Sequence, residues 1–530
     1  MTLRTSTAPL PFLRLAKRRE RHSPMRQLQG LPELIVTLGR RRLSPAETAA
    51  IVSVQVLSSL ARPGQCLISW RPGPGRSAAS RGGVDPEPGD ALRVELGGRR
   101  EPLFIGEVTV VEHTYGADLS QEVRVRAYDA LHRLRKRHFT RLHTDVDLAG
   151  LARTLCEGTG LQVVGGAMHL GEVYQCARSD LSLLVEQCAR AGTYPVVDGD
   201  ALRLTSLAGE GEPMDLELGS SLHSAEVEVS QEPAYLGAKA TGWRSEDASV
   251  QESTARTSDA KANVAADPVL SSVGAGGDLL RDNEPMSSSA QAHSLAQAEL
   301  DVRVAGQVTA VFVADGDPRL RAGRRVRVRG LAASLEGTYA IGTATHRLDG
   351  TGYETTITTA PPDPPPARRP DVFTLGTVLD VDDPEGRGRA RVRLPAFPPL
   401  ESAWAPILAL GAGPGKGLVV TPALDDTVLV LLPATDPAQT IILGGLYGRE
   451  QTPDKGANSP RDSRYTFRSA DGQQIVLDGG ARTVSFTDGH GSTVELGPEK
   501  LRITSATDMF LEAPGKAMRI RAKTVDFEEA

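Results

Sequence analysis

The sequence has few of the residues that most functional sites require. Aromatic residues make up only 4% of its 530 residues, and its four cysteines, Cys66, Cys156, Cys176 and Cys188, form no C-x-x-C pair. This spacing excludes a zinc knuckle or a dithiol redox motif, so buried reduced thiols are expected. Scarce aromatics beside 54 glycines and 36 prolines favour strands and turns over helical bundles.

Excess positive charge and long apolar runs are also lacking. The formal net charge is -6, which gives no general attraction to nucleic acid or anionic lipid. No apolar run approaches the roughly 18 residues of a membrane span. The basic N-terminal stretch, residues 1–30, lacks the apolar centre of a secretory signal. It predicts a flexible arm, and a true start at Met25 would explain it equally well. We expect a protein made in the cytoplasm that leaves, if at all, by another route.

Catalytic signatures are missing as well. The G-x-S-x-G, H-E-x-x-H and Walker patterns do not occur. Adjacent acidic residues such as Asp425-Asp426 and Glu528-Glu529 are typical of solvated turns. The prediction is a protein that is not an enzyme, with no catalytic residue, no metal site and no cofactor.

The length predicts three or four domains. Alternating strands separated by turns predict a first β-barrel over residues 31–130. Helical spacing predicts a small α/β insertion over residues 131–215, and strands resume in a second barrel over residues 216–360. Within it, residues 245–289 are rich in Ser, Ala and Gly and predict a mobile crossover. His113 and His346 follow similar strands and are interpreted as structural residues in preference to a paired ligand site.

Proline-rich residues 361–370 predict an extended linker, and polar residues 449–464 predict a second one. Five short strands between them suit an OB-type barrel over residues 371–448. Its second strand places Arg389, Arg391 and Arg393 on one face. That face is predicted to be solvated or to contact a neighbouring subunit, in preference to binding an anionic ligand.

Five strings occur in a fixed order in this barrel: Asp382-Asp-Pro-Glu-Gly-Arg-Gly-Arg-Ala-Arg-Val-Arg-Leu-Pro, Ser402-Ala-Trp-Ala-Pro, Gly413-Pro-Gly-Lys-Gly, Pro422-Ala-Leu-Asp-Asp-Thr-Val-Leu-Val and Ile442-Leu-Gly-Gly-Leu-Tyr. Together they resemble the OB domain of the VgrG and phage baseplate-spike family. The residues that carry the motif are Asp383, Pro384, Gly386, Gly388, Arg389, Val392, Trp404, Pro422, Gly444, Leu446 and Tyr447. The family usually has a glycine where this chain has Asp425.

Two looser passages, Val123–Leu134 and Gly337–Leu348, resemble the hub part of the same proteins, which is also called late control D-like. The resemblance implies a mainly β chain with two hub β-barrels, a small α/β insertion, an OB-fold barrel and a C-terminal trimeric triple-stranded β-helix. It also implies the structural central spike of a contractile injection system. Its partners would be two further copies, a hexameric tail tube with baseplate proteins, effector cargo and, transiently, a target membrane.

Residues 465–530 predict a needle from their own pattern. Apolar residues recur in pairs at i and i+2: Ile475/Leu477, Val484/Phe486, Val494/Leu496, Leu501/Ile503, Met509/Leu511, Met518/Ile520 and Val525/Phe527. One chain with a single apolar stripe cannot close a core, so three chains wound around one axis are predicted, with seven strands each and the first five pairs as their shared core. An ordinary β-domain with hairpins is disfavoured, because tight Asn-Gly and Asp-Gly turns are scarce.

The end of the needle is predicted to need a cover. Met518, Ile520, Val525 and Phe527 are the expected contacts of a separate PAAR-type cap, since the last residues hold no histidine with which some spikes bind a closing metal. The particle would be extracellular or delivered into the target on firing. The alternatives are an OB-fold nucleic-acid-binding protein, which salt-sensitive binding to single-stranded DNA would support, or a spike with tail-associated hydrolase activity.

Overall fold

The computed structural model describes residues 32–71, 85–117, 121–266, 277–364, 366–454 and 463–528. Strands make up 45% and helices 12%, which confirms the prediction of a mainly β fold. The chain divides into two compact units, Met1–Gly444 and Gly445–Ala530. The predicted arm, residues 1–30, lies outside the described residues, and no helix within them is long and apolar enough to cross a membrane.

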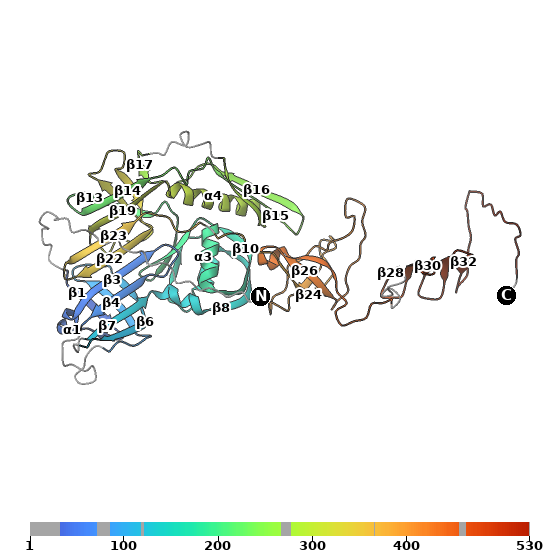
Figure 1. The fold of residues 1–530 in the computed structure, drawn as a ribbon, viewed down its shortest axis with the longest axis horizontal. Helices are drawn as coiled ribbons and strands as arrows, with labels where there is room; N and C mark the ends of the chain where they lie inside the picture. Colours follow the sequence, from blue (N-terminus) through green and yellow to red (C-terminus); the bar gives the residue numbers. More distant parts are fainter. Residues whose placement is uncertain are drawn as a thin grey trace. The chain divides into compact units, whose positions relative to one another are not determined.

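One eleven-stranded sheet runs through the hub part, residues 32–360, in the order β14-β19-β23-β22-β3-β4-β7-β6-β5-β1-β2 (Figure 1). Because β3 pairs with β22, the two predicted barrels share one continuous sheet. A short helix, α1 (Pro45–Ala49), is capped by Ser44 and precedes β3. The strands are β1 (Leu34–Leu38), β2 (Arg41–Arg42), β3 (Ile51–Ser59), β4 (Gln65–Trp70), β5 (Ala91–Leu96), β6 (Phe104–Tyr115), β7 (Gln121–Tyr128), β14 (Leu222–Val229), β19 (Val308–Asp315), β22 (Thr343–Asp349) and β23 (Gly352–Thr358).

Side-chain alternation explains this sheet. In β7, Val123 and Val125 are buried in the core of the first barrel, whereas Arg124 and Arg126 between them are exposed. A second core surrounds Phe312, whose ring meets that of Tyr339 edge to face at 5.2 Å. The period of two therefore decides which face of each strand enters a core.

His346 is part of the eleven-stranded sheet. It is buried in β22, and its Nδ1 lies within hydrogen-bond distance of the hydroxyls of Tyr353 and Thr355, at 3.1 and 3.0 Å. Burial lowers the pKa of His346 to about 3, so its ring is neutral. His113, in contrast, is exposed in β6. His346 is thus a hydrogen-bonded structural residue.

The insertion has a core of its own, in which α2 and α3 pack leucines against η2 and the surrounding strands. Asp147 and Ser179 cap the two helices by accepting backbone N–H groups. The elements are η2 (Ala130–Lys136), β8 (His138–Asp147), α2 (Leu148–Leu155), β9 (Gln162–Val164), β10 (His169–Ser179), α3 (Asp180–Arg190), β11 (Tyr194–Asp198) and β12 (Ala201–Thr205). Strands β8 and β10 form one sheet, and β9, β11 and β12 form another.

Residues 245–289, predicted to be a mobile crossover, contain regular strands in their described part. β15 (Ala238–Arg244) pairs with β16 (Ser249–Ala255) and β18 (Leu279–Pro285), and α4 (Ser289–Ala305) covers the sheet. The small residues of this segment allow close packing, because Ala238, Ala240 and Ala255 of the strands are buried in one cluster with Ala292 and Ala296 of the helix. The neighbouring sheet contains β13 (Glu210–Glu217), β17 (Asn263–Val264), β20 (Arg324–Arg329) and β21 (Gly337–Ala340).

The OB barrel has the strand order β25-β24-β26-β27. These are β24 (Val372–Asp380), β25 (Arg391–Arg393), β26 (Thr427–Leu432) and β27 (Ile441–Gly445), with the short turns η4 (Pro433–Thr435) and η5 (Pro437–Gln439) before β27. One of the five predicted strands of the barrel, Trp404-Ala-Pro-Ile-Leu, is present only as isolated bridges, Ala405 with Ala390 and Ile407 with Ile442. Gly376 admits close packing, since a Cβ there would lie 3.2 Å from the valines of the core.

Polar contacts fix the OB barrel to the hub part. The backbone N–H of Ser245 donates to the side-chain oxygen of Gln439 at 2.8 Å, and Arg369, just before the barrel, pairs with Glu186 at 2.6 Å. Burial opposes ionisation of Glu186, but Arg178 and Arg369 outweigh it and lower its pKa. The OB barrel is therefore held to the hub part by charged and amide groups as well as by apolar contact.

Candidate assembly surface

The C-terminal unit contains one antiparallel sheet, here called the needle sheet. Its strands follow one another in chain order: β28 (Arg464–Arg468), β29 (Gln474–Asp478), β30 (Thr483–Thr487), β31 (Thr493–Leu496) and β32 (Leu501–Thr504) (Figure 1). Consecutive strands form hairpins, contrary to the expectation from the scarcity of tight turns. Their loops have four or five residues and include glycines with positive φ, such as Gly472 and Gly489, and therefore need no two-residue tight turn.

The register of the needle sheet gathers the predicted pairs on one face. Phe486 lies opposite Ile475 on one side and Val494 on the other, and Val484 lies between Leu477 and Leu496. Leu501 and Ile503 continue the face, and Tyr465 and Phe467 begin it. This last pair was missed, although its i and i+2 spacing was the signal that identified the others. The needle face is thus Tyr465, Phe467, Ile475, Leu477, Val484, Phe486, Val494, Leu496, Leu501 and Ile503.

The needle face is open in the single chain. Phe486, in its middle, is 43% exposed, and Leu501 near its end is 64% exposed. The opposite face has Thr466, Ser485 and Arg502 in the corresponding positions, together with one buried apolar residue, Val476. A sheet with one mainly polar face and one uncovered apolar face needs a partner that covers the apolar face.

The three remaining predicted pairs are not in strands. Among the described residues no strand follows β32, and Met509, Leu511, Met518, Ile520, Val525 and Phe527 are all exposed. The expectation of seven strands in each chain is therefore wrong for the single chain. Pro514 and Gly515 interrupt this stretch, and a strand added to β32 would gain backbone partners on one side only.

Two residues of the OB motif, Arg389 and Asp383, form a buried ion pair. Arg389, only 2% exposed, pairs with Asp383 at 2.7 Å and with Glu246 of the hub part at 2.8 Å. Asp383 also accepts the backbone N–H groups of Glu385, Arg387 and Arg389. The guanidinium of Arg389 and these N–H groups hold the pKa of Asp383 well below its usual range. The prediction of a solvated or intersubunit arginine face is wrong for Arg389, whereas Arg393 is exposed.

Other motif residues shape the loops of the barrel. Gly386 and Gly388 have φ of +63° and +73°, Gly444 has φ of +152°, Val392 is buried, and Pro384 is exposed in the turn. Trp404 and Pro422 are partly buried, and Leu446 and Tyr447 are exposed. Asp425, where the resembled family has glycine, has φ of +65°. The backbone thus keeps the left-handed conformation that glycine adopts most easily.

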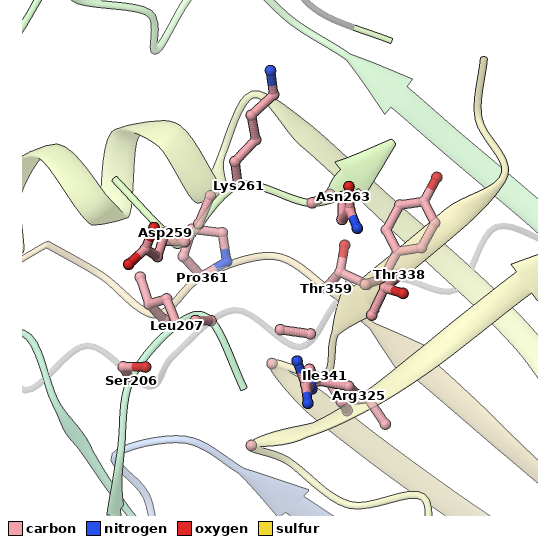
Figure 2. A pocket seen from close by; sticks show the side chains of 18 of the residues that line it. Ser206, Leu207, Asp259, Lys261, Asn263, Arg325, Thr338, Ile341, Thr359 and Pro361 are labelled. Atoms are coloured by element: carbon pink, nitrogen blue, oxygen red, sulfur yellow. The ribbon is translucent and has the colours of Figure 1, made fainter. Parts of the chain in front are cut away.

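A cavity of about 500 Å³ opens in the hub part. Figure 2 shows Asp259, Lys261 and Asn263 on one side of it and Arg325 on another. Arg325 is already engaged, because its Nε donates to the carbonyl oxygen of Gly211 at 2.9 Å. Every site residue predicted from the sequence lies beyond residue 382, so none of them lines this cavity.

Comparison with known proteins extends these observations. Residues 78–350, more than half of the chain, match the family described as the Alg8 N-terminal domain. The chain belongs to this family. In this Alg8-domain protein, residues 374–447 match the family described as the type VI secretion system/phage-baseplate injector OB domain. No curated protein matches the sequence.

The fold of the Alg8-domain protein is also similar to solved structures. The half-lidded Francisella PdpA-VgrG complex aligns with a TM-score of 0.54 and 8% identity, over 90% of this chain and 89% of that chain. The lidded form gives 0.52 and 9%, over 90% and 81%. A type VI secretion component of E. coli gives 0.49 and 13%, over 78% and 99%. The OB match and the PdpA-VgrG fold confirm the resemblance to VgrG-like baseplate spikes.

Proposed function

We propose that this Alg8-domain protein is the structural central spike of a contractile injection system and that it acts as a homotrimer. The observation that carries the proposal is the needle face, ten apolar side chains aligned by register and uncovered in one chain. Three copies arranged around an axis place three needle faces inside a prism and leave the polar faces in water. Each copy supplies one wall.

The size of the needle face supports this arrangement. Eight of its side chains are between 38% and 66% exposed. If about half of each side chain of roughly 150–200 Å² is open, one chain offers on the order of 700 Å² of apolar area. Stable interfaces bury about 800 Å² for each partner. The needle sheet alone therefore comes close to the area that a lasting association requires.

The two ends of the proposed spike have different partners. The hub part would dock on a hexameric tail tube and its baseplate, with effector cargo as a further partner. At the other end, Val525 and Phe527 support contact with a PAAR-type cap, because Phe527 is 91% exposed. Met518 and Ile520 would lie beside them. The protein would be made in the cytoplasm, assembled into the particle, and carried through the target membrane on firing.

The proposed role is mechanical and not enzymatic. Contraction of a sheath would drive the tube and spike outward, and the trimer would transmit that force. The Arg389–Glu246 ion pair and the Ser245–Gln439 hydrogen bond tie the OB barrel to the hub part, which suits a load that passes between them. The boundary between the OB barrel and the hub part should be stiff, because these contacts must break together before the two parts separate.

Multi-angle light scattering of the full chain tests the proposal. We expect the mass of a trimer and, in electron micrographs, a particle with threefold symmetry and one narrow end. A matched variant, Phe486→Asp, should reduce the mass toward that of one chain, whereas Ser485→Asp on the opposite face of β30 should not. A monomer at the concentrations of the assembled particle would refute the central-spike assignment.

A further inference from the structure

A loop of the OB barrel exposes an unusual amount of apolar surface. This loop, residues 408–424, is called the OB arm, and Lys416 is its only charged residue. Leu410 is 77% exposed and Val419 83% exposed. The exposed apolar side chains of the OB arm are Leu408, Leu410, Leu418, Val419, Val420 and Leu424. None of them belongs to the core of the barrel, which β24, β25 and β26 fill with other residues.

The OB arm is preformed and needs no partner to hold its shape. The N–H of Leu418 donates to the carbonyl oxygen of Leu410 at 3.0 Å, and Gly413 and Lys416 exchange two backbone hydrogen bonds of 3.1 Å. The arm is therefore a closed hairpin that presents leucine and valine side chains outward. A preformed arm loses little conformational entropy when it docks.

A second apolar surface lies on the outside of the same barrel and is called the OB outer face. Phe373 and Leu375 of β24 point outward, 64% and 49% exposed. They lie opposite Leu431 and Leu429 of β26, and the next outward pair is Thr377 with Thr427. The outward positions of β24 and β26 carry no charge, and the exposed Arg393 of β25, opposite Thr377, borders them on one side. Such a surface favours an apolar partner over a charged one.

We propose that the OB arm of one copy packs on the OB outer face of the next copy. This rests on the proposed trimer and adds to it an interface that the needle sheet does not contain. The OB arm and the OB outer face are on the same domain. Under threefold symmetry each arm therefore packs on the outer face of the next copy, and the ring of three closes with no arm or face left open.

A second copy fits these surfaces better than an anionic surface or a charged protein. The arm offers one cation in seventeen residues, in a chain where 24% of residues are charged. Association by this arm would therefore be insensitive to salt, because apolar burial and not charge drives it. The OB barrels would then hold the three chains together in addition to the needle sheets.

Cysteine labelling of the full chain tests this contact. The four native cysteines are buried and give little background. In the trimer, Val419→Cys should react with a maleimide at least tenfold more slowly than Ala396→Cys, a control at an exposed position of the same barrel. Equal rates in a protein that light scattering shows to be trimeric would overturn the arm contact and leave the trimer standing. A monomer would overturn both.

A second variant identifies what covers the arm. Adding Leu375→Asn to Val419→Cys should restore fast labelling, because the outer face of the neighbouring copy would no longer accept the arm. Leu236→Asn, which changes an exposed leucine of the hub part, is the matched control and should leave the cysteine protected. Protection that survives Leu375→Asn would mean that the arm packs elsewhere, on the needle or on another protein, and would overturn the proposal.

Discussion

Replacing Phe486 by alanine should weaken the proposed trimer far more than it weakens the fold of one chain. The ring lies in the middle of the needle face and is 43% exposed. With a side chain of roughly 200 Å², about 85 Å² is left for burial between copies. At about 25 cal/mol for each Å² this contributes about 2 kcal/mol for each chain, and about 6 kcal/mol for three. The equilibrium constant for dissociation should rise on the order of 10⁴-fold.

The effect within one chain should be smaller. Phe486 contacts Ile475 and Val494 as cross-strand neighbours, and such pairs contribute only about 0.2–1 kcal/mol each. Sedimentation velocity over a range of protein concentrations separates the two effects, because only association depends on concentration. Ser485→Ala, on the polar face of the same strand, is the control. An unchanged dissociation constant for Phe486→Ala, or an equal rise for Ser485→Ala, would refute the assignment of this face as the trimer core.

Three further predictions concern single chains. Asp425→Gly should raise the free energy of unfolding in urea by about 1 kcal/mol, because the backbone there has φ of +65°; a loss of stability would contradict this. Arg389→Ala should lower the urea midpoint of the OB barrel more than Arg391→Ala, since only the first leaves Asp383 without its buried partner; equal losses would contradict this. Burial lowers the pKa of His346 to about 3, so its neutral form contributes to the free energy of unfolding above about pH 6.5. This contribution should fall by up to about 1.4 kcal/mol per pH unit as the pH drops toward 3. His346→Gln should flatten the slope of the free energy of unfolding against pH, and an unchanged slope would contradict the assignment.

Local pattern was enough to predict the needle face. Because successive side chains of a strand point to opposite sides, the i and i+2 spacing of Ile475 and Leu477 already places both on one face, whatever the strand pairs with. The OB barrel was equally accessible, since its motif residues are close together in the sequence. Asp425 was noted there as a departure, and its positive φ shows why a glycine is common at that turn.

Contacts between residues that are far apart in the sequence could not be predicted from local patterns. Arg389 looked like a surface residue because it alternates with apolar residues, and its burial depends on Glu246, 143 residues earlier. The pairing of β3 with β22 likewise joins segments that no local spacing connects. The crossover was misread because alanine and serine were taken as a sign of loose packing. Against α4 they allow an approach that larger residues would prevent.

Two kinds of apolar surface in this chain lead to an order of assembly. The hub part and the OB barrel each enclose a core of their own, so they can fold before any copy is met. The needle sheet buries only Val476 among its apolar residues, and its needle face gains burial only when other needle faces arrive. Residues 505–528 have no strand partner in one chain, and in the proposed trimer their pairs would order only after β32 of three copies had come together. The spike would therefore close from its base toward its tip, and a cap that binds Val525 and Phe527 would recognise completed trimers.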